Sequence, residues 1–167
     1  MNMNQISAQR HGGDGVPARQ LATTVSGLEF LRALRDGAQP PAPFAGITEI
    51  WLAEVEAGRV VFEARPSARF YNPLGTVHGG WISTLLDSAM GCAVHSTLQP
   101  KQTYTTVDMT VSFVRPVSER TGTLRCEGKV IHVGGRIATA EGRVWDQAGG
   151  LIAHGSETCL LIAPLAA

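Results

Sequence analysis

The sequence predicts an α+β fold in which an antiparallel sheet wraps around one long central helix. Three observations lead to this prediction. An apolar run at helical spacing begins after the glycines at 79–80 and continues to about residue 98. Six strand-like segments flank that run, two before it and four after it. Glycine-containing turns join neighbouring strands into hairpins, so the order β-β-α-β-β-β-β leaves the helix to be covered by the sheet.

The whole-chain composition narrows the class of protein. A chain of 167 residues favours a single domain with a sizeable core. Its 14 basic and 14 acidic residues balance, and only 6% of residues are aromatic, so we expect no nucleic-acid partner. No apolar stretch reaches the roughly 18 residues of a membrane span, and the N-terminus lacks a signal-like apolar region. We therefore expect a cytoplasmic protein.

The cysteines and histidines do not have the spacing of a metal site. The three cysteines lie far apart, which favours free, buried thiols in a reducing compartment; they are Cys92, Cys126 and Cys159. We expect neither a metal nor a cofactor.

The N-terminal part divides into a tail and a short helix. Residues 1–24 lack periodicity and predict a mobile tail. Ser26 and Glu29 then form a capping box that begins a short helix, which ends near Gly37. With the proline-rich linker that follows it, this helix occupies residues 25–43, and the main domain occupies 44–163. The predicted strands are 44–56, 59–65, 106–114, 121–133, 136–145 and 151–162.

The central helix carries one carboxylate among small residues. Its apolar face is interrupted by a stripe of glycine, serine and threonine that also holds Asp87. An unpaired buried charge is costly, so Asp87 is neutralised, paired or functional.

The residues around this helix resemble a known family. Asn72, Gly75, the run His78-Gly79-Gly80, Leu85 and Asp87 match the pattern of PaaI-like acyl-CoA thioesterases, which have the hotdog fold. The resemblance covers roughly residues 44–163. It implies hydrolysis of aryl- or medium-chain acyl-CoA thioesters by a homodimer or a dimer of dimers.

The helix start suits an oxyanion hole. The Gly79 N–H has no partner within its helix, lies at the positive end of the helix dipole, and is open to a carbonyl oxygen. Asp87 lies eight residues later, about 12 Å along the axis at roughly 1.5 Å per residue. One thioester cannot contact both groups of one helix, whereas two antiparallel helices could share them. The spacing therefore predicts a dimer with shared sites, in which Asp87 acts as general base or nucleophile.

The resemblance suggests further site residues. Asn72 matches an amide that orients water, although an Asn-Pro turn explains it nearly as well. His78 is expected to anchor the helix start, and Gly80 to allow close packing there. The family's assisting hydroxyl aligns with Thr106, while strand alternation favours Thr105 facing the helix.

The CoA phosphates need basic or N–H-rich contacts. Arg115, Gly135 and Arg136 have the right chemistry, although surface arginines beside turns are common. Two other functions remain open: a non-catalytic acyl-CoA-binding or regulatory domain, and a hydratase or dehydratase using His78 with an acid.

Overall fold

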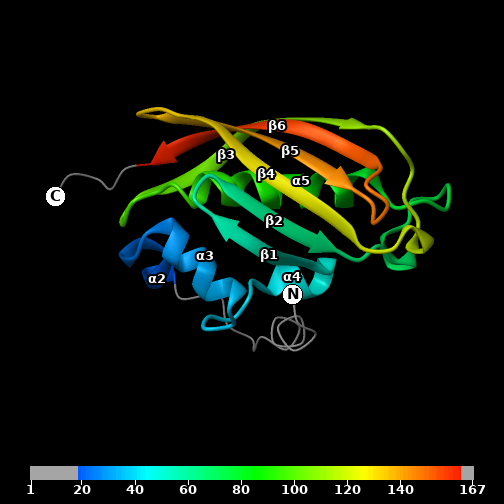
Figure 1. Cartoon of the computed structure of the whole chain (residues 1–167), viewed down its shortest axis with the longest axis horizontal. Coiled ribbons are helices and arrows are strands. Elements are labelled where there is room, and N and C mark those ends of the chain that lie inside the picture. The colour runs from blue at the N-terminus through cyan, green and yellow to red at the C-terminus, as the bar shows by residue number, and fades with distance from the viewer. Residues whose placement is uncertain (1–18, 163–167) are drawn as a thin grey trace.

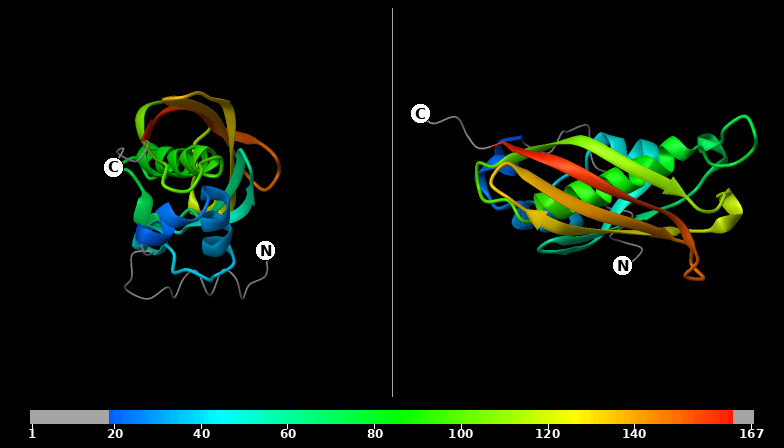
Figure 2. Two further views of the ribbon diagram at one scale, coloured as in Figure 1. Left: turned by 90° about the vertical axis from the view of Figure 1, so that its left-hand side faces the viewer. Right: turned by 90° about the horizontal axis from the view of Figure 1, so that it is seen from above.

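The computed structural model describes residues 19–162, in which a six-stranded sheet curls around helix α5 (Figure 1). The strand order is β1-β2-β4-β5-β6-β3, and every neighbouring pair is antiparallel. Viewed end-on, the sheet closes around α5 on several sides (Figure 2). This confirms the predicted α+β architecture. The elements are β1 (Ile50–Glu56), β2 (Arg59–Ala64), α5 (Gly79–His95), β3 (Thr103–Phe113), β4 (Leu124–Val133), β5 (Ile137–Trp145) and β6 (Leu151–Ile162), with short 3-10 turns at Ala68–Phe70 and Glu119–Thr121.

Three short helices precede the sheet: α2 (Arg19–Thr24), α3 (Gly27–Arg35) and α4 (Pro43–Thr48). The capping box is present, because Ser26 Oγ accepts from the Glu29 N–H while the Glu29 carboxylate accepts from the Ser26 N–H. Helix α3 packs against β1, on the side of the molecule where all three helices lie (Figure 1).

The N-terminal boundaries differ from the prediction at two places. Residues 19–24 form α2 rather than a tail, and the Thr23 carbonyl accepts from the Lys101 N–H at 2.6 Å, which docks the helix on the main domain. The rest of the expected tail, residues 1–18, lies outside the described residues. Residues 44–48 form α4 rather than the start of a strand. Proline at the first helical position favours this turn, and Glu49 ends it in the left-handed region at φ 56°.

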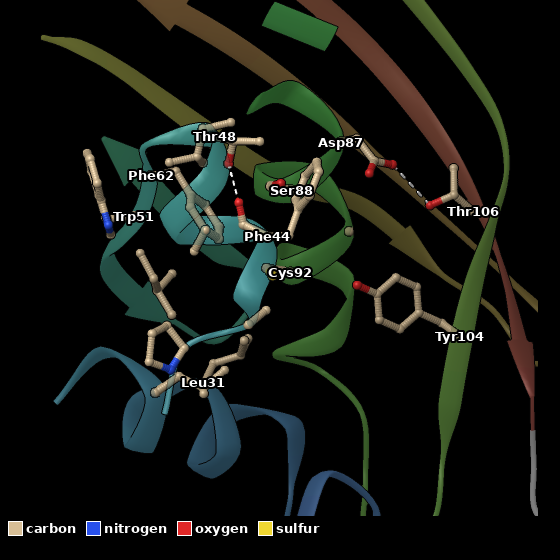
Figure 3. A pocket seen from close by; sticks show the side chains of 17 residues that line it. Leu31, Phe44, Thr48, Trp51, Phe62, Asp87, Ser88, Cys92, Tyr104 and Thr106 are labelled. Atoms are coloured by element: carbon tan, nitrogen blue, oxygen red, sulfur yellow. Dashed lines mark hydrogen bonds between the residues drawn. The ribbon is translucent and has the colours of Figure 1, made fainter. Parts of the chain in front are cut away.

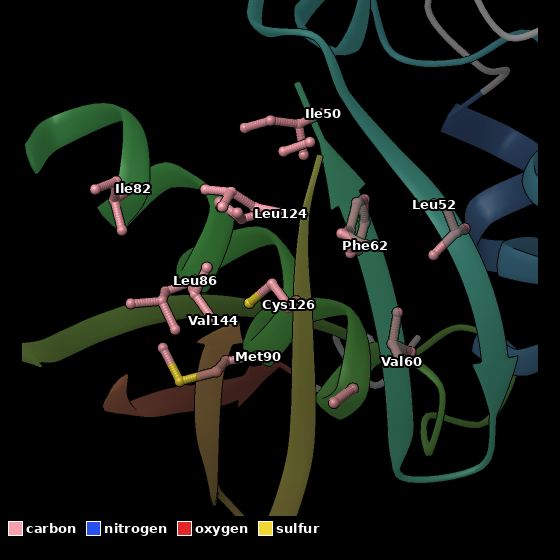
Figure 4. Close-up of a cluster of buried hydrophobic side chains, with 14 of the residues drawn as sticks. Ile50, Leu52, Val60, Phe62, Ile82, Leu86, Met90, Leu124, Cys126 and Val144 are labelled. Carbon is pink, nitrogen blue, oxygen red and sulfur yellow. The ribbon is translucent and has the colours of Figure 1, made fainter. Parts of the chain in front are cut away.

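The core lies between α5 and the inner face of the sheet (Figure 4). On α5, the side chains at helical spacing are fully buried: Leu85, Leu86, Ala89, Met90, Ala93 and Val94. Three glycines pair across the sheet, Gly128 on β4, Gly142 on β5 and Gly155 on β6, and the first two contact α5. A Cβ at Gly128 would stand 2.2 Å from the Ala89 carbonyl oxygen, so the backbone of α5 rests directly on the sheet here.

Strand β3 is one edge of the sheet and is bulged. It pairs with β6 through Thr106 opposite Cys159 and Asp108 opposite Thr158, which leaves Val107 as the extra residue. The bulge reverses the alternation of side chains along the strand. Thr106 and Met109 therefore both face α5, while the Val107 side chain is 55% exposed.

Candidate active site

A largely apolar pocket of about 300 Å³ lies between the N-terminal helices and the main domain (Figure 3). It is bounded by α3, α4, the first two strands, one face of α5 and the beginning of β3. Most of its lining is aliphatic or aromatic, and Asp87 is its one acidic residue. Figure 3 shows Asp87 and Leu31 on opposite sides of the pocket. The lining residues include Leu31, Leu34, Phe44, Trp51, Phe62, Asp87, Ser88, Cys92, Tyr104 and Thr106.

Asp87 meets Thr106 at the sheet edge. The Thr106 Oγ1 lies 3.4 Å from Asp87 Oδ1, as the dashed line in Figure 3 shows. Thr105, the alternative from strand alternation, does not line the pocket. Because the β-bulge follows Thr106, alternation counted back from Met109 gives the wrong threonine. The structure therefore brings Asp87 together with the threonine that the family alignment indicated.

A second carboxyl group, which sequence reasoning did not identify, lies next to this pair. Glu157 on β6 is only 2% exposed. Its Oε1 accepts from Thr106 Oγ1 at 2.7 Å and from Cys159 Sγ at 3.0 Å, while its Oε2 is buried with no hydrogen-bond partner in the described part of the chain. Burial raises the pKa of Glu157, and the Asp87 charge raises it further, against the lowering effect of the Thr106 and Cys159 hydrogen bonds.

The start of α5 forms a separate region of the site. His78 is the N-cap, and its Nδ1 accepts from the Gly80 N–H at 2.9 Å, so it anchors the helix start as expected. Within residues 19–162, the Gly79 N–H meets no hydrogen-bond acceptor. A Cβ at Gly79 would lie 3.0 Å from the Phe113 ring. Gly79 lines a second cavity with Phe113 and Arg115, apart from the pocket that holds Asp87.

Asn72 shapes the loop before α5. Its Oδ1 accepts from the Leu74 and Thr76 N–H groups, and its Nδ2 donates to Thr76 Oγ1 at 3.0 Å. These bonds close a tight turn at Gly75, whose φ is 79°. The turn-forming interpretation of Asn72 therefore has direct support in the geometry, and Asn72 lies with the helix start rather than with Thr106.

The basic residues considered for phosphate contact lie at opposite ends of the molecule. Arg115 follows β3, whereas Gly135 and Arg136 form the β4–β5 turn at the other end (Figure 1). The Arg115 guanidinium is already engaged, because it donates to the Leu151 carbonyl at 2.8 Å and pairs with Asp146 at 3.3 Å. Gly135 and Arg136 are exposed.

The remaining ionisable groups near the pocket are held neutral. Burial raises the pKa of the Cys92 thiol to about 12 and that of Cys159 to about 12, so neither is a ready nucleophile. All three cysteines are unpaired. Across residues 19–162, no three His, Cys, Asp or Glu side chains gather as a metal site. No helix in that range combines the length and apolar character that a membrane span requires.

Comparison with known proteins agrees with this architecture. Residues 74–153 match the profile of the thioesterase superfamily. A protein of Halobacterium salinarum named as an esterase is 41% identical over 70 residues, a segment that covers 40% of this chain and only 44% of that protein.

Solved structures extend the likeness over most of the domain. A phenylacetic-acid-degradation-related thioesterase of Ralstonia eutropha is 27% identical, with TM-score 0.68 over 79% of this chain and 96% of its own. The Escherichia coli PaaI protein is 22% identical, with a TM-score of 0.66 over 72% of this chain and 84% of its own. A Streptococcus mutans protein solved with acetyl-CoA is 23% identical, with a TM-score of 0.62 over 68% of this chain and 89% of its own. The chain is therefore a hotdog-fold protein that is similar to the thioesterase superfamily over residues 74–153 and to PaaI-like thioesterases over most of the domain.

Proposed function

We propose that this protein hydrolyses acyl-CoA thioesters that carry an aryl or medium-chain acyl group. The observation that carries the proposal is the placement of Asp87, a half-buried carboxylate beside the Thr106 hydroxyl, at one side of a pocket lined mainly by apolar groups. Transfer of an apolar acyl group from water to such a lining is favourable in free energy. The thioester carbonyl would then lie next to Asp87.

The chemistry needs a base or nucleophile, an oxyanion donor and a good leaving group. As general base, Asp87 takes a proton from a water molecule whose oxygen attacks the thioester carbonyl carbon. As nucleophile, Asp87 attacks that carbon itself, and water then hydrolyses the resulting anhydride. In both routes a tetrahedral oxyanion forms, and its collapse breaks the C–S bond and releases CoA thiolate. A thiol has a pKa near about 8.5, so the thiolate leaves without a strong general acid.

The oxyanion donor in this proposal is the Gly79 N–H of a second copy of the chain. Gly79 and Asp87 of one helix are about 12 Å apart at roughly 1.5 Å per residue, and they line different cavities. Support for a shared site comes from the position of the Asp87–Thr106 pair at strand β3, an edge strand that is largely exposed along its length. Two copies joined along β3 would bring a partner to this edge.

One finding supports acyl-CoA as the ligand, and another argues against a hydratase or dehydratase role. A Streptococcus mutans protein with this fold was solved with bound acetyl-CoA, which supports an acyl-CoA ligand for this chain. A hydratase or dehydratase role for His78 conflicts with its N-cap bond, since its Nδ1 already accepts from the Gly80 N–H.

The test is release of free thiol from a panel of aryl-CoA and straight-chain acyl-CoA thioesters by the purified protein. We expect Asp87→Asn to lower kcat by about 100-fold to 10,000-fold, the usual loss for a general base, with KM largely unchanged. Asp36→Asn, an exposed carboxylate that caps α3, is the matched control and should keep the wild-type rate. Tight acyl-CoA binding without thiol release would instead identify a binding or regulatory domain.

A further inference from the structure

Glu157 is the buried carboxyl group of the described chain, and the hydrolysis mechanism above makes no use of it. Its side chain lies under the sheet, where its Oε1 would stand 3.4 Å from a Cβ at Gly91 of α5. An acidic side chain is almost never fully buried unless it is paired. No basic side chain pairs with it among residues 19–162.

The Glu157 hydrogen bonds fit a neutral carboxylic acid. Both donors, Thr106 and Cys159, contact the same oxygen, Oε1. The other oxygen, Oε2, is buried and unpartnered. A carboxylate would leave part of its charge on that unsolvated oxygen, which is costly, whereas a neutral acid leaves only a carbonyl there.

The Thr106 hydroxyl connects the two carboxyl groups. It lies 2.7 Å from Glu157 Oε1 and 3.4 Å from Asp87 Oδ1. A hydroxyl has one proton to donate and can also accept. When Glu157 is ionised, the Thr106 proton goes to Glu157. When Glu157 carries a proton on Oε1, it donates to Thr106, and Thr106 is then free to donate to Asp87.

We propose that Glu157 is a positioning residue whose protonation decides which of the two carboxyl groups the Thr106 hydroxyl serves. In the neutral state, the chain of donors runs from Glu157 through Thr106 to Asp87 and fixes the Asp87 carboxylate towards the pocket. When Glu157 ionises, the Thr106 hydroxyl donates to Glu157, and Asp87 loses its hydrogen bond from Thr106. The effect on turnover rests on the proposed thioesterase function, whereas the coupling of the two carboxyls does not.

The groups that face Glu157 allow this switch. Helix α5 contributes Asp87 and Cys92, strand β3 contributes Tyr104 and Thr106, and β6 contributes Cys159. The neighbouring strand β5 places Ala140 opposite Glu157. Asp87 is the acidic neighbour, and its charge opposes ionisation of Glu157. Burial raises the pKa values of Cys92, Tyr104 and Cys159, so they remain neutral while Glu157 titrates.

The first experiment is the pH profile of kcat for the wild type and for Glu157→Gln, which keeps the shape and cannot ionise. We expect kcat of the wild type to fall by about tenfold as Glu157 ionises, the effect of losing one hydrogen bond to a charged group. The Glu157→Gln profile should lack this fall. In the Thr106→Val variant, kcat should not fall in this way. Adding Glu157→Gln to that variant should leave the pH profile of kcat unchanged. An unchanged alkaline limb in Glu157→Gln would overturn the proposal.

A second experiment needs no enzymatic activity and uses only single variants that keep Glu157. The carboxyl carbons of ¹³C-labelled glutamate are followed by NMR through a pH titration, with the Glu157 resonance assigned by its loss in Glu157→Gln. We expect Glu157 to titrate above the ordinary range of glutamate and to shift to higher pH in Thr106→Val, because the Thr106 hydrogen bond favours the ionised form. In Asp87→Asn it should shift to lower pH. Titration in the ordinary range, or no response to either substitution, would contradict the proposed switch even in a protein that proves inactive on thioesters.

Discussion

At the scale of the residue, a carboxyl group has different surroundings and different proposed roles at two positions 70 residues apart in the sequence. Asp87 is half-buried, faces the pocket and has the Thr106 hydroxyl at 3.4 Å. Glu157 is 2% exposed and has one oxygen without a partner. Solvent access and hydrogen bonding, rather than residue type, therefore suit Asp87 to base or nucleophile chemistry and Glu157 to the neutral state.

His95 gives a prediction about stability and pH. Its ring packs against Phe30 of α3 and Tyr104 of β3, at centroid distances of 5.5 and 5.6 Å, and burial lowers its pKa to about 4. The unfolded chain takes up this proton near the ordinary value of about 6.5. Between these values the folded state binds fewer protons, so the free energy of unfolding falls as pH drops through that window.

Replacement of His95 by phenylalanine should remove this part of the pH dependence, because the ring contacts remain and the titration does not. The measurement is urea unfolding at a series of pH values between about 7 and 4. The slope of the unfolding free energy against pH should decrease by an amount that corresponds to at most about one bound proton. His154→Gln, which changes an exposed histidine, is measured alongside as the control. Equal slopes for His95→Phe and wild type would refute the assignment to His95.

At the scale of the element, the start of α5 offers a matched pair of substitutions. Gly79→Ala and Gly79→Pro both add a Cβ 3.0 Å from the Phe113 ring, but only proline removes the N–H. Proline is tolerated at the first helical position, and His78 already has the extended backbone, φ −61° and ψ 134°, that a following proline requires.

We expect Gly79→Pro to lower kcat by a further 100-fold to 1,000-fold relative to Gly79→Ala, roughly the effect of losing one oxyanion-hole donor. The readout is thiol release at saturating acyl-CoA, with circular dichroism to confirm that both variants fold. If the two variants have similar rates, the Gly79 N–H is not the donor, and the loss belongs to the added Cβ.

The sequence predicted those elements whose side-chain pattern is regular. The 3.6-residue period of α5 and the glycine turns between β4, β5 and β6 gave the right elements in the right order. Helix α4 was missed because its residues, Pro-Phe-Ala-Gly-Ile-Thr, carry no helical period over a single turn. Docking against the domain, rather than local propensity, explains α2.

Within the site, Asp87 was predictable because a carboxylate interrupts an apolar helix. Thr106 could be chosen only through the family resemblance, since the bulge at Val107 breaks the alternation that sequence reasoning assumes. Glu157 was missed although a signal exists: it lies two residues from Cys159, a buried position on the same face of β6. One buried cysteine is a weak guide to strand orientation, so tertiary packing was needed to reveal the acid.

At the scale of the whole molecule, the proposed shared site predicts complementation between two inactive proteins. The Asp87→Asn protein keeps the Gly79 N–H donor, and the Gly79→Pro protein keeps the Asp87 carboxylate. In a mixed dimer, one of the two sites combines both intact groups. Random mixing makes half of the dimers mixed, so activity should recover to about a quarter of the wild-type value.

The measurement is thiol release after the two variants are unfolded together and refolded, compared with each variant refolded alone. Sedimentation at the assay concentration should show a dimer or a larger assembly. An active monomer would disprove sharing. So would a mixture that is no more active than the sum of the separate variants.

The glycine row at positions 128, 142 and 155 has a consequence for how sequence variation in this protein should be interpreted. Gly128 contacts the α5 backbone at Ala89, and the Leu86 and Met90 side chains of the same helix rest on Gly142, whereas Gly155 contacts the β3 backbone at Thr110. A single added methyl at Gly128 would collide with the Ala89 carbonyl and push the helix outward. Asp87 lies on the same helix, so its position relative to Thr106 on strand β3 would change. Displacement of a catalytic group by about 1 Å can cost roughly 100-fold in rate. Under the proposed function, substitution of a glycine that does not line the pocket would therefore lower the rate by changing the Asp87–Thr106 distance, as a substitution of Asp87 would.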